Sequence, residues 1–197
     1  MPHLFEPFTI KKITLRNRIG VSPMCTYSAV EGMTNDWHVV HLGSRAAGGA
    51  GLIIAEATAV EARGRITPHD VGIWSDEQIE PLARVTQAIK AHGAIAGIQI
   101  AHAGRKASMN RPWDGAKPIL PDDPRGWQVV GPSPVPFHEG YQVPHELTKV
   151  EIHEVQQTFR AGAQRALQAG FEWLEIHAAH GYLIHSFYSP ISNQRTD

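Results

Sequence analysis

Short apolar runs alternate along this chain with segments in which apolar residues recur at helical spacing. The runs predict strands at 19–24, 51–56, 94–100 and 171–176, and near-continuous apolar runs of this kind are typical of parallel strands buried on both faces. The helical spacing predicts helices at 36–47, from Ser75 to Gly93 and from Thr148 to Gly170. The alternation therefore predicts four βα-type repeats.

Polar capping residues and glycines mark the ends of these helices. A serine or threonine followed three residues later by glutamine or glutamate forms a capping box, and glycine commonly ends a helix. The caps are Asn35 or Asp36, Ser75 with Gln78, and Thr148 with Glu151, and the stops are Gly48-Gly49, Gly93 and Gly170. The predicted buried faces are Ile79, Leu82, Thr86 and Ile89 in the second helix and Ile152, Val155, Phe159, Ala163 and Leu167 in the third.

A long stretch that holds most of the prolines, 105–147, separates the third strand from the third helix. Loops of this length inside a compact domain are commonly lids or binding elements. We expect a lid or capping insertion with a short hairpin. It should cover the carboxyl ends of the strands, because both the insertion and His177 leave the sheet there.

Repeated βα units close either as an open, doubly wound sheet or as a (β/α)8 barrel. The open sheet usually carries a glycine-rich phosphate loop after its first strand, and Val21–Tyr27 has no such glycines. We therefore predict an α/β fold of the TIM-barrel type, with residues 1–197 forming the N-terminal half of a single domain. A complete barrel has eight units and about 250 residues, so four units should leave an unpaired sheet edge on each side.

Composition excludes several classes of function without selecting one. The chain has 197 residues, is 42% hydrophobic and 19% charged, and carries a formal net charge of -1, which argues against nucleic-acid and membrane partners. No apolar stretch reaches the ~18 residues of a transmembrane candidate, and the first residues lack a signal-peptide pattern. Cys25 is the single cysteine, which rules out an internal disulfide and fits a cytoplasmic protein.

Two histidines and a tyrosine follow the fourth strand in the run His177-Ala-Ala-His180-Gly-Tyr182. Imidazoles donate hydrogen bonds to an oxygen that gains negative charge, and a phenol can deliver a proton. The trio therefore suits polarisation and protonation of a carbonyl-conjugated substrate. Barrel active sites lie at the carboxyl ends of the strands. The other three ends carry Ser22-Pro23-Met24-Cys25, Glu56-Ala57 and Gln99.

Together these residues resemble the Old Yellow Enzyme family of flavin-dependent ene reductases, and more narrowly its bacterial branch with a cysteine in the first-strand motif. The resemblance covers the whole chain. It is carried by Leu4-Phe5-Glu-Pro-Phe8, Leu15-Arg-Asn-Arg-Ile19, Ser22 to Cys25, Gln99-Ile-Ala-His-Ala-Gly-Arg105, Gly131-Pro-Ser-Pro134, His177 to Tyr182, and Asn193-Gln-Arg-Thr-Asp197. It implies a (β/α)8 barrel with FMN lying across its mouth.

The resemblance also implies a role for each matching residue. Reduced FMN would pass a hydride to Cβ of an α,β-unsaturated carbonyl compound, Tyr182 would protonate Cα, and NADPH or NADH would reduce the flavin. His177 and His180 would bind the carbonyl oxygen, and Tyr27 would help to shape the substrate pocket. The implied flavin contacts are Ser22, Pro23, Met24 and Cys25 along the ring, Ala57, His177, and Gln99 at the pyrimidine end.

Two histidine pairs also have a plainer explanation. A metal pair formed by His177 and His180 would need a third ligand, and the chain has no His-Glu-x-x-His helix, so we predict no metal site. His38 and His41 have the same spacing inside a predicted helix. There a packed or partly solvated histidine is the better interpretation.

Other polar and aromatic residues stay open or favour structure. His102 and Arg105 either bind substrate or anchor the lid-side loop to the barrel. Glu56 follows an apolar run, which suggests a carboxylate in a structural hydrogen-bond network rather than a general base. The lid tryptophans Trp113 and Trp127 form a hydrophobic cap in the simplest interpretation and stack on a ligand in the sharper one.

The resemblance further implies that part of the cofactor site lies elsewhere. The family holds the FMN phosphate with groups from the last two barrel units, and those positions do not occur in these 197 residues. We expect a C-terminal half-barrel chain or a homo-oligomer to complete the site, or a cleaved or truncated product. The rival hypothesis is an inactive half-barrel that acts as an assembly or interaction module through its strand edges.

Overall fold

A four-stranded parallel sheet forms the centre of the computed structural model, which describes residues 3–197. Its strands are β3 (Gly20–Val21), β4 (Leu52–Ala59), β5 (Ile95–Ala101) and β8 (Trp173–Ile176), adjacent in chain order. All three pairings are parallel, as the predicted succession of βα units requires. The first strand is shorter than the predicted 19–24, and the second continues to Ala59, beyond its predicted end at Glu56.

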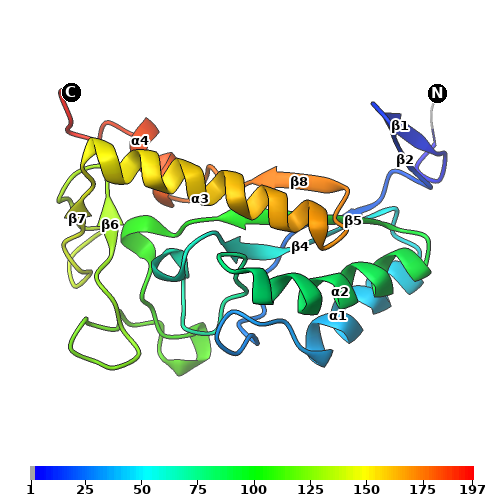
Figure 1. Cartoon of the computed structure of the whole chain (residues 1–197), viewed down its shortest axis with the longest axis horizontal. Helices are drawn as coiled ribbons and strands as arrows, with labels where there is room; N and C mark the ends of the chain where they lie inside the picture. Colours follow the sequence, from blue (N-terminus) through cyan, green and yellow to red (C-terminus); the bar gives the residue numbers. More distant parts are fainter. Residues whose placement is uncertain (1–2) are drawn as a thin grey trace.

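Helices α1 (Asp36–Ala47), α2 (Ile79–Ala91) and α3 (Lys149–Gln168) connect these strands, and α4 (Leu183–Tyr188) follows β8 (Figure 1). The predicted caps are confirmed. Asn35 accepts a hydrogen bond from Trp37 N, a short 3-10 turn, η2 (Asp76–Gln78), leads into α2, and both predicted capping boxes are formed. The helix starts are therefore fixed by local polar contacts.

The main core lies between the sheet and α1, α2 and α3. It joins Ile53 of β4 and Ile98 of β5 to Leu82 and Ile89 of α2 and to Ala166 of α3. Side chains alternate between the two faces of a strand, so the helices cover one face of the sheet, and the opposite face carries a smaller apolar cluster.

That smaller cluster holds an N-terminal hairpin that the sequence analysis did not predict. Strands β1 (Phe8–Ile10) and β2 (Ile13–Leu15) pair antiparallel, and Leu15 packs with Leu52 and Ile54 of β4. Arg16 donates hydrogen bonds to Ala46 O at 2.6 Å and Ala50 O at 2.8 Å. The hairpin therefore lies at the amino ends of the strands, opposite the lid (Figure 1).

Residues 105–147 form the predicted long insertion at the carboxyl ends, and within it Met109 and Pro118 form an antiparallel bridge. Strands β6 (Val130–Gly131) and β7 (His145–Glu146) pair parallel, because a long loop separates them instead of a tight turn. The remaining structure around the insertion is irregular apart from three short 3-10 turns: η1 (Ala62–Gly64), η3 (Gly104–Lys106) and η4 (Pro112–Asp114).

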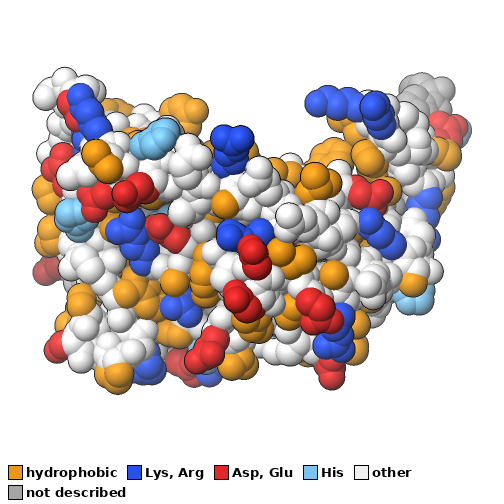
Figure 2. Space-filling view, in the orientation of Figure 1, with side chains coloured by type: hydrophobic (Ala, Val, Ile, Leu, Met, Phe, Trp, Pro, Cys, Tyr) orange, Lys and Arg blue, Asp and Glu red, His pale blue; other side chains and the backbone are white. Residues whose placement is uncertain are grey.

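The two outer strands, β3 and β8, leave the sheet edges that the sequence predicts. On β8, Leu174 is 43% and Ile176 is 55% exposed. Leu167 is 74% exposed, so its predicted burial is wrong. It lies in a depression beside Leu174 on this edge. Figure 2 shows a hollow between the N-terminal hairpin and the C-terminal segment, which project from opposite ends of the molecule.

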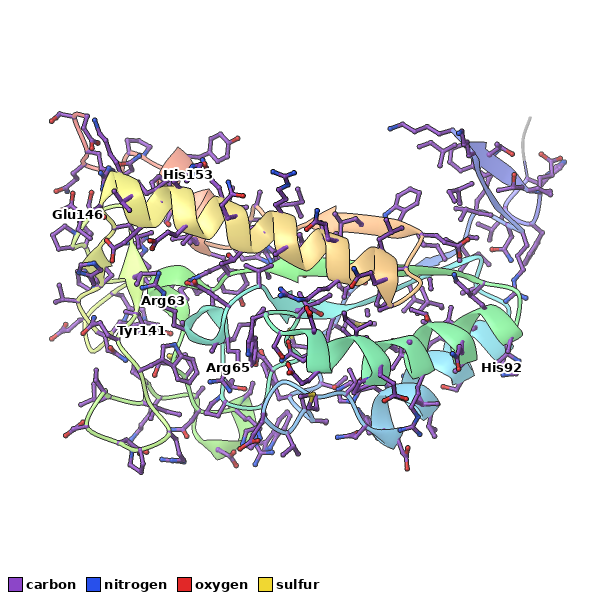
Figure 3. All side chains as sticks on the ribbon, in the orientation of Figure 1. Arg63, Arg65, His92, Tyr141, Glu146 and His153 are labelled. Carbon is purple, nitrogen blue, oxygen red and sulfur yellow. The ribbon has the colours of Figure 1, made fainter. Side chains whose placement is uncertain are left out.

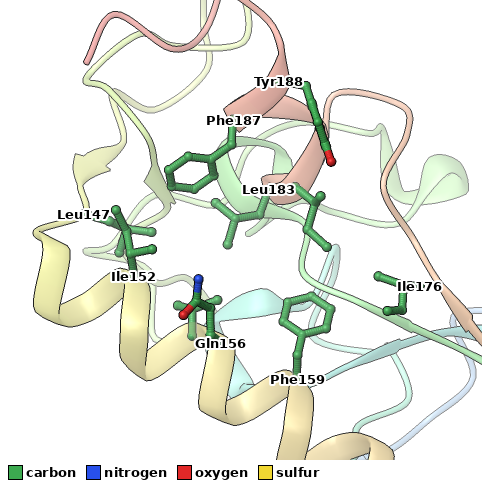
Figure 4. Close-up of a pocket in the computed structure, with 10 residues that line it drawn as sticks. Leu147, Ile152, Gln156, Phe159, Ile176, Leu183, Phe187 and Tyr188 are labelled. Carbon is green, nitrogen blue, oxygen red and sulfur yellow. The ribbon is translucent and has the colours of Figure 1, made fainter. Parts of the chain in front are cut away.

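An apolar groove of about 470 Å³ continues from this edge between α3 and α4. Figure 4 shows Phe159 of α3 and Phe187 of α4 on its two sides and Ile176 of β8 at one end. Exposed apolar surfaces of this kind mark interaction sites.

Candidate active site

His177, His180 and Tyr182 form one cluster directly after β8. The ring centroids of His177 and Tyr182 are 4.7 Å apart, and those of the two histidines are 5.1 Å apart. His180 has a φ of 57° and Gly181 a φ of 76°. Positive φ is uncommon for a residue other than glycine and concentrates at functional sites. The turn folds both histidine rings back toward the tyrosine.

The hydrogen bonds of the histidines assign their tautomers. Ala179 N donates to Nδ1 of His177 at 3.3 Å, so the proton of the neutral His177 ring lies on Nε2. This Nε2 lies 3.3 Å from Nδ1 of His180. Burial, and secondarily His180, lower the pKa of His177. In this tautomer His177 Nε2 donates to His180 Nδ1, so the ring N–H that remains free is on His180 Nε2. That N–H is suited to donate to a substrate oxygen.

The Tyr182 hydroxyl is held in its protonated form. Burial raises the pKa of Tyr182, and Cys25, Tyr27 and Asp70 raise it further. Tyr182 therefore carries a proton throughout the neutral range.

Lys106 is a neighbour of the trio that the sequence analysis missed. Its Nζ donates to His180 O at 2.9 Å and lies 5.3 Å from the centroid of the Tyr182 ring. The contact fixes the backbone at His180, where φ is positive. The signal for this residue is its position directly after Arg105 in the matching Gln99–Arg105 motif.

The segment from Ser22 to Cys25 leaves β3 without further strand pairing among the described residues. Ser22 is exposed, Met24 is 53% exposed, and Pro23 and Cys25 are half-buried. Burial raises the pKa of the Cys25 thiol, and Asp70 and Glu56 add to the effect. A thiol held neutral can donate a weak hydrogen bond and is a poor nucleophile.

Tyr27 lies against Cys25 and against the lid. Its φ is 50°, and its ring meets the Trp113 ring edge-on at a centroid distance of 5.9 Å. Burial, and then Cys25, raise the pKa of Tyr27.

Ala57 and Glu56 lie inside β4 rather than at its end, which corrects their predicted position. The β4–β5 pairing shifts between Ala55 and Ala57, so Glu56 is the extra residue of a β-bulge. Glu56 is buried and accepts hydrogen bonds from Thr26 N at 2.9 Å and Thr26 Oγ1 at 2.7 Å. These contacts confirm that Glu56 belongs to a structural network.

Gln99 lies near the carboxyl end of β5, as predicted, and has a partner that the sequence analysis missed. Its Nε2 donates to Glu175 Oε1 of the adjacent β8 at 2.5 Å. This bond fixes the orientation of the amide. The structure gives Gln99 Oε1 no partner among residues 3–197, so the acceptor end of the amide is free for an N–H group of a ligand.

His102 and Arg105 both anchor the lid-side loop, which is one of the two roles that the sequence left open. His102 Nδ1 accepts from Gly104 N at 3.0 Å, so its Nε2 donates to Glu61 Oε1 at 2.7 Å. Arg105 Nη1 donates to Val135 O and Pro136 O, each at 3.1 Å. These bonds tie the end of β5 to the insertion.

The two lid tryptophans differ in their surroundings. Trp127 Nε1 donates to Arg63 O at 2.8 Å, and the Arg65 guanidinium lies 4.8 Å from the Trp127 ring centroid. Figure 3 shows Arg63 and Arg65 on the segment between the sheet and the insertion. Trp113 is 63% exposed. Trp127 thus secures the insertion to the body, and Trp113 presents its ring beside Tyr27.

Across residues 3–197, the structure brings no three histidine, cysteine, aspartate or glutamate side chains into a metal-binding arrangement. Within the same residues no helix has the length and apolar character needed to cross a bilayer.

Comparison with known proteins identifies the family. The model of the NADH:flavin oxidoreductase / NADH oxidase family matches residues 3–197. The chain belongs to this family. An NADPH dehydrogenase of Listeria innocua is 50% identical over 199 residues, covering 100% of this chain and 54% of the relative. An NADH:flavin oxidoreductase of Gibberella zeae is 48% identical over 197 residues, covering 98% of this chain and 48% of the relative.

Solved structures give the same result. Morphinone reductase matches with a TM-score of 0.85 and 29% identity, over 100% of this chain and 53% of its own. The Old Yellow Enzyme homologue from Zymomonas mobilis matches with a TM-score of 0.85 and 32% identity, over 100% and 54%. The resemblance to Old Yellow Enzyme is confirmed. The chain spans about half the length of the curated relatives it matches, and its βα units correspond to part of the TIM barrel of these neighbours.

Proposed function

We propose that this chain is the N-terminal half of an FMN-dependent NAD(P)H oxidoreductase that reduces the activated C=C bond of α,β-unsaturated carbonyl compounds. The observation that carries the proposal is the cluster of His177, His180 and Tyr182 at the carboxyl end of the sheet, the end at which Ser22–Cys25 also leaves β3. FMN, reduced by NADPH or NADH, supplies the hydride in this chemistry. The protein supplies orientation, hydrogen bonds and the proton.

The two histidines bind and polarise the substrate. His180 Nε2–H donates to the carbonyl oxygen, and His177 Nε2–H joins it by turning from His180 Nδ1 when the substrate binds. Negative charge gathers on this oxygen as the C=C bond accepts the hydride. His177 stays neutral because its pKa is lowered by burial, so it acts as a donor without releasing a proton. The fixed turn at His180 and Gly181 orients both rings before the substrate arrives.

Tyr182 delivers the proton to Cα. Its hydroxyl lies next to His177, and its raised pKa keeps it protonated at neutral pH. Lys106, 5.3 Å from the ring centroid, stabilises the negative charge that the oxygen gains as the proton leaves. Tyr27 and Trp113 line the lid side of the proposed substrate pocket.

The residues present fit the isoalloxazine part of FMN. Gln99 offers a fixed amide with a free acceptor oxygen, Ala57 adds little bulk, and Ser22 to Cys25 form an extended, partly exposed segment suited to lie along a planar ring. Basic groups for the phosphate are not part of this arrangement. We propose that they come from the C-terminal half of the barrel.

The open β8 edge and the groove between α3 and α4 are where that half would pack. Leu174 and Ile176 are exposed on the edge strand, and apolar side chains line the groove. In a barrel a further strand pairs with β8, and its helix covers these residues. The curated relatives, which are about twice as long as this chain, support a partner half of this kind.

The test is a fluorescence titration of FMN with the chain alone and with an equimolar second half of the Listeria innocua relative. We expect flavin binding and NADPH-dependent reduction of 2-cyclohexenone only in the mixture, and loss of the reduction step in a His177→Ala mixture. A lone 21.7 kDa chain that binds FMN and reduces the enone would contradict the half-barrel proposal. Stable oligomers that never bind FMN would support the interaction module instead.

A further inference from the structure

The β-bulge in β4 gives Glu56 an unusual position. Ala55 pairs with Ile98 and Ala57 with Gln99, so Glu56 has no partner residue on β5. Bulges redirect side chains and are common beside active sites. Glu56 is only 5% exposed, and Thr58 Oγ1 donates to its carbonyl oxygen at 2.8 Å. The bulge is therefore internally bonded, and it directs a carboxylate toward Thr26.

The buried carboxylate holds the segment between Cys25 and Tyr27. Its two oxygens accept from Thr26 N at 2.9 Å and Thr26 Oγ1 at 2.7 Å. The backbone of Tyr27 also acts on the carboxylate and lowers its pKa against the larger, raising effect of burial. Tyr27 has a φ of 50°, a conformation that persists only where surrounding contacts impose it.

His38 is the other polar neighbour of Glu56, and it does not supply a positive charge to the carboxylate. His38 Nε2 lies 3.8 Å from Glu56 Oε1 and has no hydrogen-bond partner among residues 3–197. Burial lowers the pKa of His38 to about 4. The imidazole is therefore neutral at pH 7, and the hydrogen bonds of the carboxylate go to Thr26 rather than to a cation.

We propose that Glu56 is a positioning residue that acts through Thr26 to fix Cys25 and Tyr27 at the mouth of the sheet. The proposed function supplies the flavin and the substrate that these two residues would face. The hydrogen bonds from Thr26 to Glu56, called the clamp below, do not depend on it. The hydrogen bonds of the Glu56 carboxylate go to Thr26 and not to the trio. Its effect reaches the site only through the backbone of residues 25–27.

The thiol of Cys25 reports on this clamp. It is the only thiol in the chain, so its alkylation can be followed without ambiguity. The groups that act on it are Asp70 and Glu56, which raise its pKa, and the Ala57 backbone and Tyr27 hydroxyl, which lower it. Loss of the Glu56 charge therefore lowers the pKa of the thiol, and loss of the clamp exposes its sulfur.

The experiment measures the rate of Cys25 alkylation by iodoacetamide from pH 7 to 10, by intact mass, in the protein without added flavin. Glu56→Gln should react about 5–20-fold faster than the wild type at each pH, because the thiolate fraction rises as the pKa of the thiol falls. Thr26→Val keeps the charge and loses one hydrogen bond. It should react about 2–4-fold faster.

Glu61→Gln is the matched control, since this carboxylate bonds His102 and Arg63 instead of Thr26. It should react at the wild-type rate. Wild-type rates in both Glu56→Gln and Thr26→Val would overturn the proposal. If circular dichroism shows that Glu56→Gln does not fold, Thr26→Val decides alone. Because iodoacetamide needs no FMN, failure here is distinct from failure of the flavin titration.

Discussion

The sequence His-x-x-His occurs twice in this chain, and the two copies serve different purposes. His38 and His41 lie in α1, and His177 and His180 lie in the turn after β8. His38 is buried, and its Nδ1 accepts from Asn35 N at 3.1 Å, which completes a capping box. In the second pair the two rings face each other beside Tyr182. Spacing alone therefore does not distinguish a helix cap from an active site.

The backbone makes the difference. In a helix, residues three apart share a face. Each ring of this pair contacts a local neighbour: His38 accepts a hydrogen bond from Asn35 N, and His41 stacks on Trp37. After β8 the chain turns through two residues with positive φ. Such a turn is free to direct both rings toward one point at the end of the sheet, where other strand ends meet.

The largest effect is expected from Tyr182→Phe. Five residues after the first histidine, the turn carries Tyr182 and the helix carries Gly43, so only the turn copy has a proton donor. In the flavin-loaded assembly the enone-reduction step should slow by about 100–10,000-fold, while flavin reduction by NADPH stays unchanged in stopped-flow traces. Tyr188→Phe, at an 80% exposed position of α4, is the control. Equal rates in both variants would remove Tyr182 from the mechanism.

His177→Ala should have the next largest effect. Compared with a substitution in the helix pair, it tests directly whether the two histidine pairs differ in function. Loss of one donor to a developing negative charge costs about 100–1,000-fold in turnover. His41→Ala, at the partly buried helix position, should leave turnover within about threefold of the wild type, in keeping with surface substitutions. Steady-state assays with enone and NADPH check both. A comparable loss in His41→Ala would mean that α1 contributes to the site.

The helix pair should instead control stability at acidic pH. The pKa of His38 is about 4 in the folded protein and about 6.5 when unfolded. Between these values the unfolded state binds the proton, so the contribution is fully present above pH 6.5 and is lost as pH falls to 4. Urea unfolding of wild type and His38→Asn should show their difference shrinking by about 3 kcal/mol from pH 7 to 4. A constant difference would contradict a neutral, buried His38.

The contrast also shows what the sequence could and could not predict. Helix starts were predictable because capping boxes are local, as at Thr148 and Glu151. Candidate site residues could be chosen from the sequence because strand ends in one parallel sheet converge. The bulge at Glu56 and the bond from Gln99 to Glu175 depend on register between strands, which no local pattern contains. Leu167 was assigned to a buried face that no described element covers.

The smallest effect is expected from Asn35→Ala, which removes the N-cap side chain of α1 that forms the capping box with His38. Asn35 accepts from Trp37 N at 3.0 Å, and its Nδ2 donates to Ser28 O at 2.7 Å. Loss of an N-cap side chain costs about 1 kcal/mol, so the urea midpoint at pH 7 should fall by the corresponding amount. The Ser28 bond ties the start of α1 to the segment that carries Cys25. A modest increase in thiol alkylation should therefore accompany the loss of stability, whereas an unchanged alkylation rate would separate the helix cap from the active-site segment.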